Sequence, residues 1–284
     1  MQPATMHAAV SMDPAVAVGG VGGSGTRLIA TLLQELGVRI GEQCHTRARD
    51  ALWFSLLFKR VEILDADDAT FDRMTRALVQ ALTGGQPLSA QAEAEVRALA
   101  DAPRMHHDPG QLAQIADTLV DAAARPPHGG AWGWKEPNTH VVIERLVPRL
   151  PRLRYLHVVR NGLDMAFSGN QRQRDLWGPS VFGRDVEKTP RDSLAYWCEV
   201  HRRVAAFGES MGDRFLWLDY DGLCRDPDTG LAALADFLRV PRARMLALRP
   251  LVAVQETAGR GRGMPLDAFA EADLDYLRRL GHLD

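Results

Sequence analysis

Five glycines stand among residues 19–25, directly after the short apolar run at 15–18. Apolar residues then recur at helical spacing from Leu28 to Leu36. This order predicts a strand, a glycine loop and a helix. Backbone N–H groups at a helix start converge on one point and the helix dipole adds positive potential, favouring a bound oxyanion by up to about 2 kcal/mol. The predicted phosphate-binding residues are Gly22, Gly23, Ser24, Gly25, Thr26 and Arg27.

The spacing from Gly20 to Gly25 also matches the glycine pair of a nucleoside triphosphate loop. That loop requires a Lys after its last glycine, to contact the β- and γ-phosphates, and Thr26 stands there instead. Asp219, which ends the apolar segment 215–218, is the candidate magnesium ligand for such a site. A P-loop kinase is therefore one alternative, and a nucleotide-sensing module without catalysis is another.

A second anion site is predicted at Arg160 and Ser168, which stand eight residues apart with Asp164 midway. Arg160 ends a predicted strand and offers a forked, permanently charged donor suited to phosphate. Ser168 is expected two turns along the following helix, on the face that looks back at Arg160. Residues 145–174 contain seven Arg and one acid, which predicts an anion-attracting stretch.

The segment GGSGTRLIATLL resembles the 5′-phosphosulfate loop of the sulfotransferase superfamily, and R-x3-D-x3-S resembles its 3′-phosphate clamp. Tyr220 to Leu223 with Pro227 is similar to the family's YEDL…DP segment. Residues 259–263 resemble its Arg/Gly loop, with Arg260 and Arg262 as candidate phosphate contacts. The resemblance implies sulfuryl transfer from 3′-phosphoadenosine 5′-phosphosulfate (PAPS) to a hydroxyl or amine of a small-molecule or carbohydrate acceptor. The product would be 3′-phosphoadenosine 5′-phosphate (PAP), and no metal is required.

Many members of that family place a Lys in the loop, where this chain has Gly23. The resemblance implies that Lys135, in the segment Trp-Lys-Glu-Pro, serves the transferring sulfuryl group, with Arg27 as a second cation. Only three of the 34 basic residues are Lys, so a Lys at this strand end is a specific choice.

Several residues are candidates for the base that deprotonates the acceptor. Asp50 heads a segment similar to the Glu-x-x-Phe-Phe of heparan-type enzymes and is favoured. Glu42 lies in a run similar to that of tyrosylprotein-type enzymes, although their catalytic acid corresponds to Gln43 here. Glu136 and His45 are further alternatives.

Strands are expected at 15–18, 130–134, 153–159 and 214–218, alternating with helices. This alternation predicts an α/β three-layer sandwich with a central, mostly parallel, P-loop-like sheet. We expect one domain over 14–284, a loose tail at 1–13 and a helical insertion at 60–128 whose three or four helices fall within 68–125. Further expectations are a helix at 50–60, a helix from an Asn138 N-cap through Leu150, a polar loop at 171–190, and helices at 192–210, 227–238 and 265–282. The insertion and the polar loop are expected to shape the acceptor pocket.

The composition excludes several classes of function. With 34 basic and 36 acidic residues among 284, the net charge of −2 argues against a general nucleic-acid binder. No apolar run is long enough to span a bilayer, and the first 13 residues lack the pattern of a secretory signal. Three cysteines without paired spacing are typical of reduced thiols, so the expected location is cytoplasmic.

Overall fold

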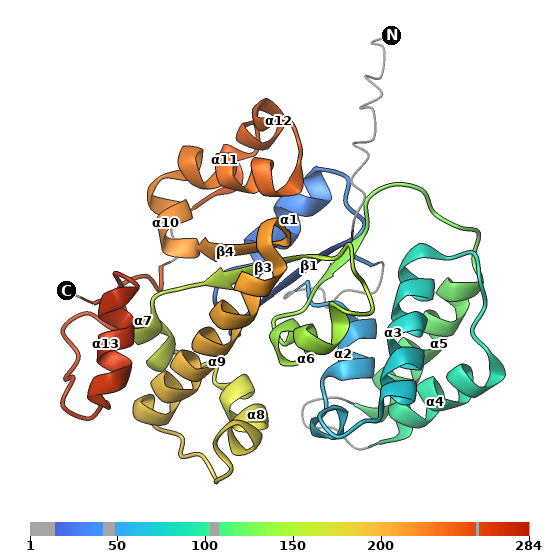
Figure 1. The fold of residues 1–284 in the computed structure, drawn as a ribbon, viewed down its shortest axis with the longest axis horizontal. Coiled ribbons are helices and arrows are strands. Elements are labelled where there is room, and N and C mark those ends of the chain that lie inside the picture. The colour runs from blue at the N-terminus through green and yellow to red at the C-terminus, as the bar shows by residue number, and fades with distance from the viewer. Residues whose placement is uncertain (1–14, 42–48, 103–107, 254–255, 284) are drawn as a thin grey trace.

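The computed structural model describes residues 15–41, 49–102, 108–253 and 256–283, and at its centre is a four-stranded sheet (Figure 1). The strands are β1 (Val16–Gly20), β2 (Gly133–Lys135), β3 (Arg154–Val159) and β4 (Phe215–Asp219). Their order is β2-β1-β3-β4, and every pairing in this sheet is parallel. The predicted central parallel sheet is confirmed.

The strand register decides what meets at the carboxyl edge of the sheet. Val18 of β1 lies opposite Lys135, and Val159 of β3 lies opposite Asp219. The loop that follows Gly20 therefore leaves the sheet at the same edge as Lys135 and Arg160. Ligands of open parallel sheets bind at this edge.

Both faces of the sheet are buried, because alternate strand residues enter two separate cores. Val16, Val18 and Leu156 pack with the helices on one face. Ala17 and Tyr155 pack with those on the other. The first face is covered by α1 (Thr26–Glu35), α10 (Tyr220–Arg225), α11 (Pro227–Leu238) and α12 (Arg242–Leu246). The second is covered by α6 (Thr139–Leu146) and α9 (Pro190–Met211), which confirms the three-layer sandwich (Figure 1).

The described residues between 68 and 125 form three helices beside the sheet: α3 (Asp68–Thr83), α4 (Ala90–Asp101) and α5 (Pro109–Ala124) (Figure 1). Each begins at a side-chain cap, since Asp67, Ser89 and Asp108 accept hydrogen bonds from backbone N–H groups of the first turn. The short helix α2 (Leu52–Phe58) precedes them and buries Trp53, Phe54 and Phe58. Among the described residues of this stretch there is no strand, as expected.

The predicted polar loop at 171–190 is wrong over most of its length, because α8 (Arg172–Phe182) occupies it. The buried residues of α8 include Gln173, Arg174 and Trp177, so the helix has no apolar periodicity. Polar contacts hold it instead. Arg174 Nη1 donates to Ser193 Oγ at 2.6 Å, and Trp177 Nε1 donates to Asn138 Oδ1 at 2.8 Å.

Several other helices are shorter than predicted. Helix α6 ends at Leu146, and the Asn138 side chain makes no capping hydrogen bond, because its Oδ1 accepts from Trp177 Nε1 instead. Helix α7 (Gly162–Ala166) ends two residues before Ser168, which therefore does not lie on a helical face. The chain finishes with α13 (Glu271–Arg279). Within the described ranges, no helix has the length and apolar character needed to cross a bilayer.

Candidate functional site

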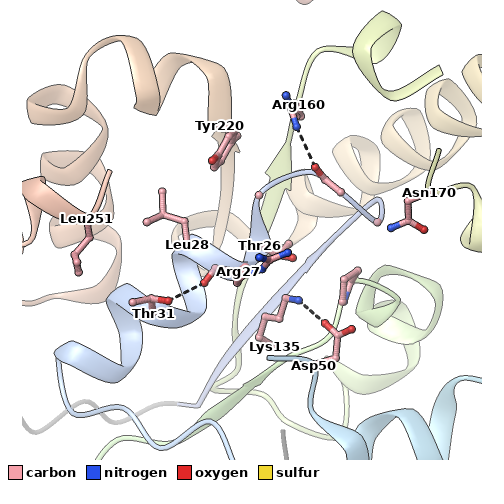
Figure 2. Close-up of a pocket in the computed structure, with 14 residues that line it drawn as sticks. Thr26, Arg27, Leu28, Thr31, Asp50, Lys135, Arg160, Asn170, Tyr220 and Leu251 are labelled. Carbon is pink, nitrogen blue, oxygen red and sulfur yellow. Dashed lines mark hydrogen bonds and ion pairs between the residues drawn. The ribbon is translucent and has the colours of Figure 1, made fainter. Parts of the chain in front are cut away.

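A cleft of about 400 Å³ opens at the carboxyl edge of the sheet (Figure 2). It brings together chain segments that are far apart in the sequence, including the glycine loop, the end of β2, the end of β3 and the start of α10. The residues that line it are Gly22, Gly23, Gly25, Thr26, Arg27, Leu28, Thr31, Asp50, Lys135, Pro137, Arg160, Asn170, Tyr220 and Leu251. Both predicted anion sites thus contribute to one cleft.

The glycine loop presents the uncapped start of α1 to this cleft. Gly25 occupies the N-cap position in the left-handed conformation (φ 95°), and it provides no side-chain cap. A Cβ on Gly25 would lie 2.1 Å from the Tyr220 ring, so only glycine fits there. The first turn of α1 contains no acid. Its backbone N–H groups and dipole therefore favour an oxyanion.

The two hydroxyl groups of the loop have different positions. Thr26 lines the cleft. Ser24 is fully buried and is not among the lining residues. Its Oγ has no hydrogen-bond partner among the described residues, and a Cβ on Gly20 would lie only 2.6 Å from it. The Ser24 hydroxyl therefore lies against Gly20 of β1 rather than in the cleft lining.

Arg160 reaches the loop from the end of β3 and is only 6% exposed. Its Nη1 donates to the Gly23 carbonyl oxygen at 3.5 Å (Figure 2). Its Nη2 donates to Thr257 Oγ1 at 2.9 Å. Asp221 lies 3.8 Å from Nε, but Nε makes no hydrogen bond within the described part of the chain. A buried guanidinium with unused donor capacity is suited to an anion in the cleft.

The Asp164 carboxylate ties the C-terminal glycine-rich loop to the element that begins at Arg160. It accepts hydrogen bonds from the Gly259 N–H at 2.7 Å and from the Gly261 N–H at 2.8 Å. A Cβ on Gly261 would lie 2.5 Å from Leu163, so the loop backbone packs directly against α7 and leaves no room for a side chain at this position. The aspartate of the R-x3-D-x3-S element is thus a structural clamp.

Three other predicted phosphate contacts do not line the cleft: Ser168, Arg260 and Arg262. Ser168 is still close to the glycine loop, since a Cβ on Gly23 would lie 4.0 Å from its Oγ. Arg260 is half-buried and Arg262 is exposed. Glu42 and His45 lie outside the described residues.

The predicted anion-attracting stretch at 145–174 is wrong for most of its arginines. Arg145 and Arg149 pair with Asp68 of α3, at 3.3 and 2.9 Å, and Arg149 also pairs with Asp72. Their charges join α6 and the segment after it to α3, away from the cleft. Of the seven arginines, Arg160 is the one that lines it.

Lys135 and Asp50, predicted separately as a cation and a base, form an ion pair in the cleft (Figure 2). Lys135 is buried, with 3% exposure, whereas the Asp50 side chain is 23% exposed. The Ala51 N–H donates to the Lys135 carbonyl oxygen at 2.8 Å. This backbone bond holds the segment of Asp50 against the end of β2.

Glu136, a further alternative for the base, is fully buried behind this pair and does not line the cleft. Its carboxylate lies 3.5 Å from Lys59 Nζ and accepts hydrogen bonds from the Asn138 backbone and side-chain amides. Burial raises the pKa of Glu136, and the negative charge of Asp50 acts in the same direction, against the opposing effect of Lys59.

Some lining residues were not predicted as site residues, among them Asn170, Thr31, Leu28 and Leu251. Leu28 and Thr31 fit the helical pattern of α1 and gave no separate signal. Asn170 stands two residues after Ser168, and its closeness to that predicted site residue was the one feature of the sequence that could have indicated it. Asp219, the magnesium ligand of the kinase alternative, is not a lining residue. Its carboxylate accepts from the Asp221 N–H at 3.0 Å as the cap of α10.

Comparison with known proteins agrees with this geometry. A family model described as "Sulfotransferase family" matches residues 14–244. The fold is similar to the sulfotransferase domain of the olefin synthase from Synechococcus PCC 7002, with 16% identity, a TM-score of 0.52 and 96% coverage of both chains. It is also similar to the sulfotransferase domain from the curacin biosynthetic pathway, with 14% identity, a TM-score of 0.52 and coverage of 95% of this chain and 98% of that one. No curated protein matches the sequence significantly.

Proposed function

Since the chain belongs to the sulfotransferase family, we propose that it transfers the sulfuryl group of PAPS to a hydroxyl or amine of a small-molecule or carbohydrate acceptor. The observation that supports this donor best is that one cleft is lined both by the uncapped helix start at Gly25 and Thr26 and by the buried Arg160. A ligand that bears two separate anionic groups matches that pair of sites.

The residues present fit PAPS by their donor chemistry. Backbone N–H groups at residues 22–27 and the Thr26 hydroxyl would hold the 5′-phosphosulfate. The guanidinium of Arg160, which lines the same cleft, would hold the 3′-phosphate. Ser168, whose Oγ lies close to Gly23, and the sequence-predicted contacts Arg260 and Arg262 are proposed to supplement Arg160.

PAPS supplies a sulfuryl group on a phosphate leaving group. The protein's part is to remove the acceptor's proton and to stabilise negative charge on the oxygen that leaves. Asp50, exposed to the cleft, is the proposed base. It takes the proton as the acceptor atom bonds to sulfur and the sulfur–oxygen bond to the nucleotide breaks, which leaves PAP and the sulfated acceptor.

The ion pair of Lys135 and Asp50 couples these two tasks. Protonation neutralises Asp50 and so weakens its hold on the Lys135 ammonium. The released charge is then available to the leaving oxygen when negative charge develops there. Arg27, which is exposed and lines the same cleft, is the proposed second cation. The unpaired spacing of the cysteines supports a reducing, cytoplasmic location as part of this proposal.

The test is a transfer assay with labelled PAPS against a panel of phenols, saccharides, lipid headgroups and amines. We expect label in at least one acceptor class, together with release of PAP. A thermal-shift series accompanies it, in which PAP should stabilise the protein strongly and ATP with Mg²⁺ only weakly. Equal stabilisation by both nucleotides would argue against a 3′-phosphate clamp. Strong stabilisation by PAP without transfer to any acceptor would instead favour the non-catalytic module.

A further inference from the structure

Asn170 is a polar residue of the cleft to which no role has yet been given. It lies in the segment between α7 and α8 and lines the cleft beside the glycine loop (Figure 2). A Cβ built on Gly22 would lie 3.3 Å from Asn170 Nδ2, so the side-chain amide is in contact distance of the loop's first turn. The amide makes no hydrogen bond to the described part of the protein.

The backbone around Asn170 is firmly held. Gln171 Nε2 donates to the carbonyl oxygens of Met165 at 2.8 Å and Ser168 at 2.9 Å, which closes the end of α7. The Asn170 N–H donates to Ser168 Oγ at 3.2 Å. A donor on a fixed backbone, with its side chain open to the cleft, is preorganised for a ligand.

The position of Asn170 along the cleft indicates which part of the ligand it meets. Leu28, Thr31 and Leu251 line one end, and Asn170 lies beyond the loop on the side of Lys135 and Asp50 (Figure 2). Apolar side chains suit the adenine base, so the reacting end of the nucleotide would face the polar side. No residue of the loop from 21 to 26 has a charged side chain.

From this placement we propose that Asn170 Nδ2 donates a hydrogen bond to a sulfuryl oxygen of the bound donor. The inference rests on the proposed function and adds a catalytic residue to it. A neutral amide can donate to the sulfuryl oxygens without competing with Lys135 for the Asp50 carboxylate, as a second cation would. The 3′-phosphate contact of Arg160 does not depend on it.

The experiment compares two nucleotides that differ only in the sulfuryl group. Calorimetric titrations with PAP, and with PAPS in the absence of acceptor, are made on the wild type, Asn170→Ala and Asn170→Asp. Arg172→Ala is the matched control, since Arg172 is exposed, two residues away and not part of the cleft lining.

We expect PAP affinity to stay within about twofold of wild type in Asn170→Ala and in Arg172→Ala. PAPS affinity should fall about tenfold in Asn170→Ala, as expected for one hydrogen bond to a charged group. It should fall further in Asn170→Asp, because a carboxylate repels the sulfuryl oxygens. The transfer rate should fall with it, whereas Arg172→Ala should match wild type in every measurement.

Unchanged ratios of PAPS to PAP affinity in both Asn170 variants would overturn the inference while leaving the proposed function intact. Equal losses for PAP and PAPS would also overturn it, because they would show a structural role for the side chain. If the wild type binds neither nucleotide, the proposed function fails and the inference fails with it.

Discussion

Replacement of Arg160 by Ala should remove the 3′-phosphate site while leaving the glycine loop in place. The guanidinium is 6% exposed, so solvent screens its interactions weakly. Hydrogen bonds to charged groups contribute about 1.5–3 kcal/mol each. Two such bonds would contribute up to about 6 kcal/mol. The side chain already bonds Thr257 and lies 3.8 Å from Asp221 without a ligand, so part of its interaction energy is not gained on binding and we halve that value. A loss of about 3 kcal/mol corresponds to PAP binding about 150-fold more weakly.

Arg154→Ala is the matched control for this measurement. Arg154 is 4% exposed and stands at the opposite end of the same strand, where Nη1 donates to the Phe237 carbonyl oxygen at 2.6 Å. Its loss should lower the free energy of unfolding and leave PAP affinity unchanged. Calorimetric titration with PAP, on samples checked for folding by circular dichroism, gives both values. PAP binding by Arg160→Ala within threefold of wild type, or an equal loss in Arg154→Ala, would refute the reasoning.

Three further outcomes are expected. Lys135→Ala should spare PAP affinity and lower the transfer rate at least about 100-fold, measured at saturating PAPS, since it removes charge stabilisation of the leaving oxygen; equal losses in binding and rate would contradict this role. Asp164→Asn should weaken PAP binding about fivefold and speed amide hydrogen exchange at Gly259 and Gly261, because only one acceptor remains for their two N–H groups; unchanged exchange would contradict the clamp. Burial lowers the pKa of His201 to about 3, so His201 binds a proton less readily in the folded protein than in the unfolded chain. The free energy of unfolding should therefore fall as the pH drops below 6.5, the ordinary pKa of histidine. In urea denaturation between pH 6 and 4, His201→Gln should reduce that dependence by about 1.4 kcal/mol per pH unit, and an unchanged slope would show that the residue does not titrate this way.

Local patterns were sufficient where one short segment determines its own structure. The order of residue types up to residue 36 was enough to predict the strand, the glycine loop and the helix. Arg160 could be identified as an anion-binding residue because its guanidinium follows an apolar strand. The parallel sheet then followed from alternation of strands and helices. The strand, the loop and the helix depend on residue patterns within one short segment, which the sequence displays directly, whereas the pairing of Val16 with Arg154 in the sheet does not.

Predictions failed where partners come from elsewhere in the chain. The arginines at 145 and 149 looked like an anion-attracting surface because their acids, on α3, precede them by 77 to 81 residues. Helix α8 was taken for a loop because its buried face is held by polar contacts to α9 and to Asn138. The pairing of Lys135 with Asp50, which are 85 residues apart, follows from tertiary structure alone.

A crystal structure of the protein with PAP tests the central claim most directly. The account predicts that one molecule of PAP bridges the cleft, with its 5′-phosphate on the backbone N–H groups at 22–27 and its 3′-phosphate on the guanidinium of Arg160. A 3′-phosphate directed away from Arg160, or a 5′-phosphate outside the glycine loop, would contradict it.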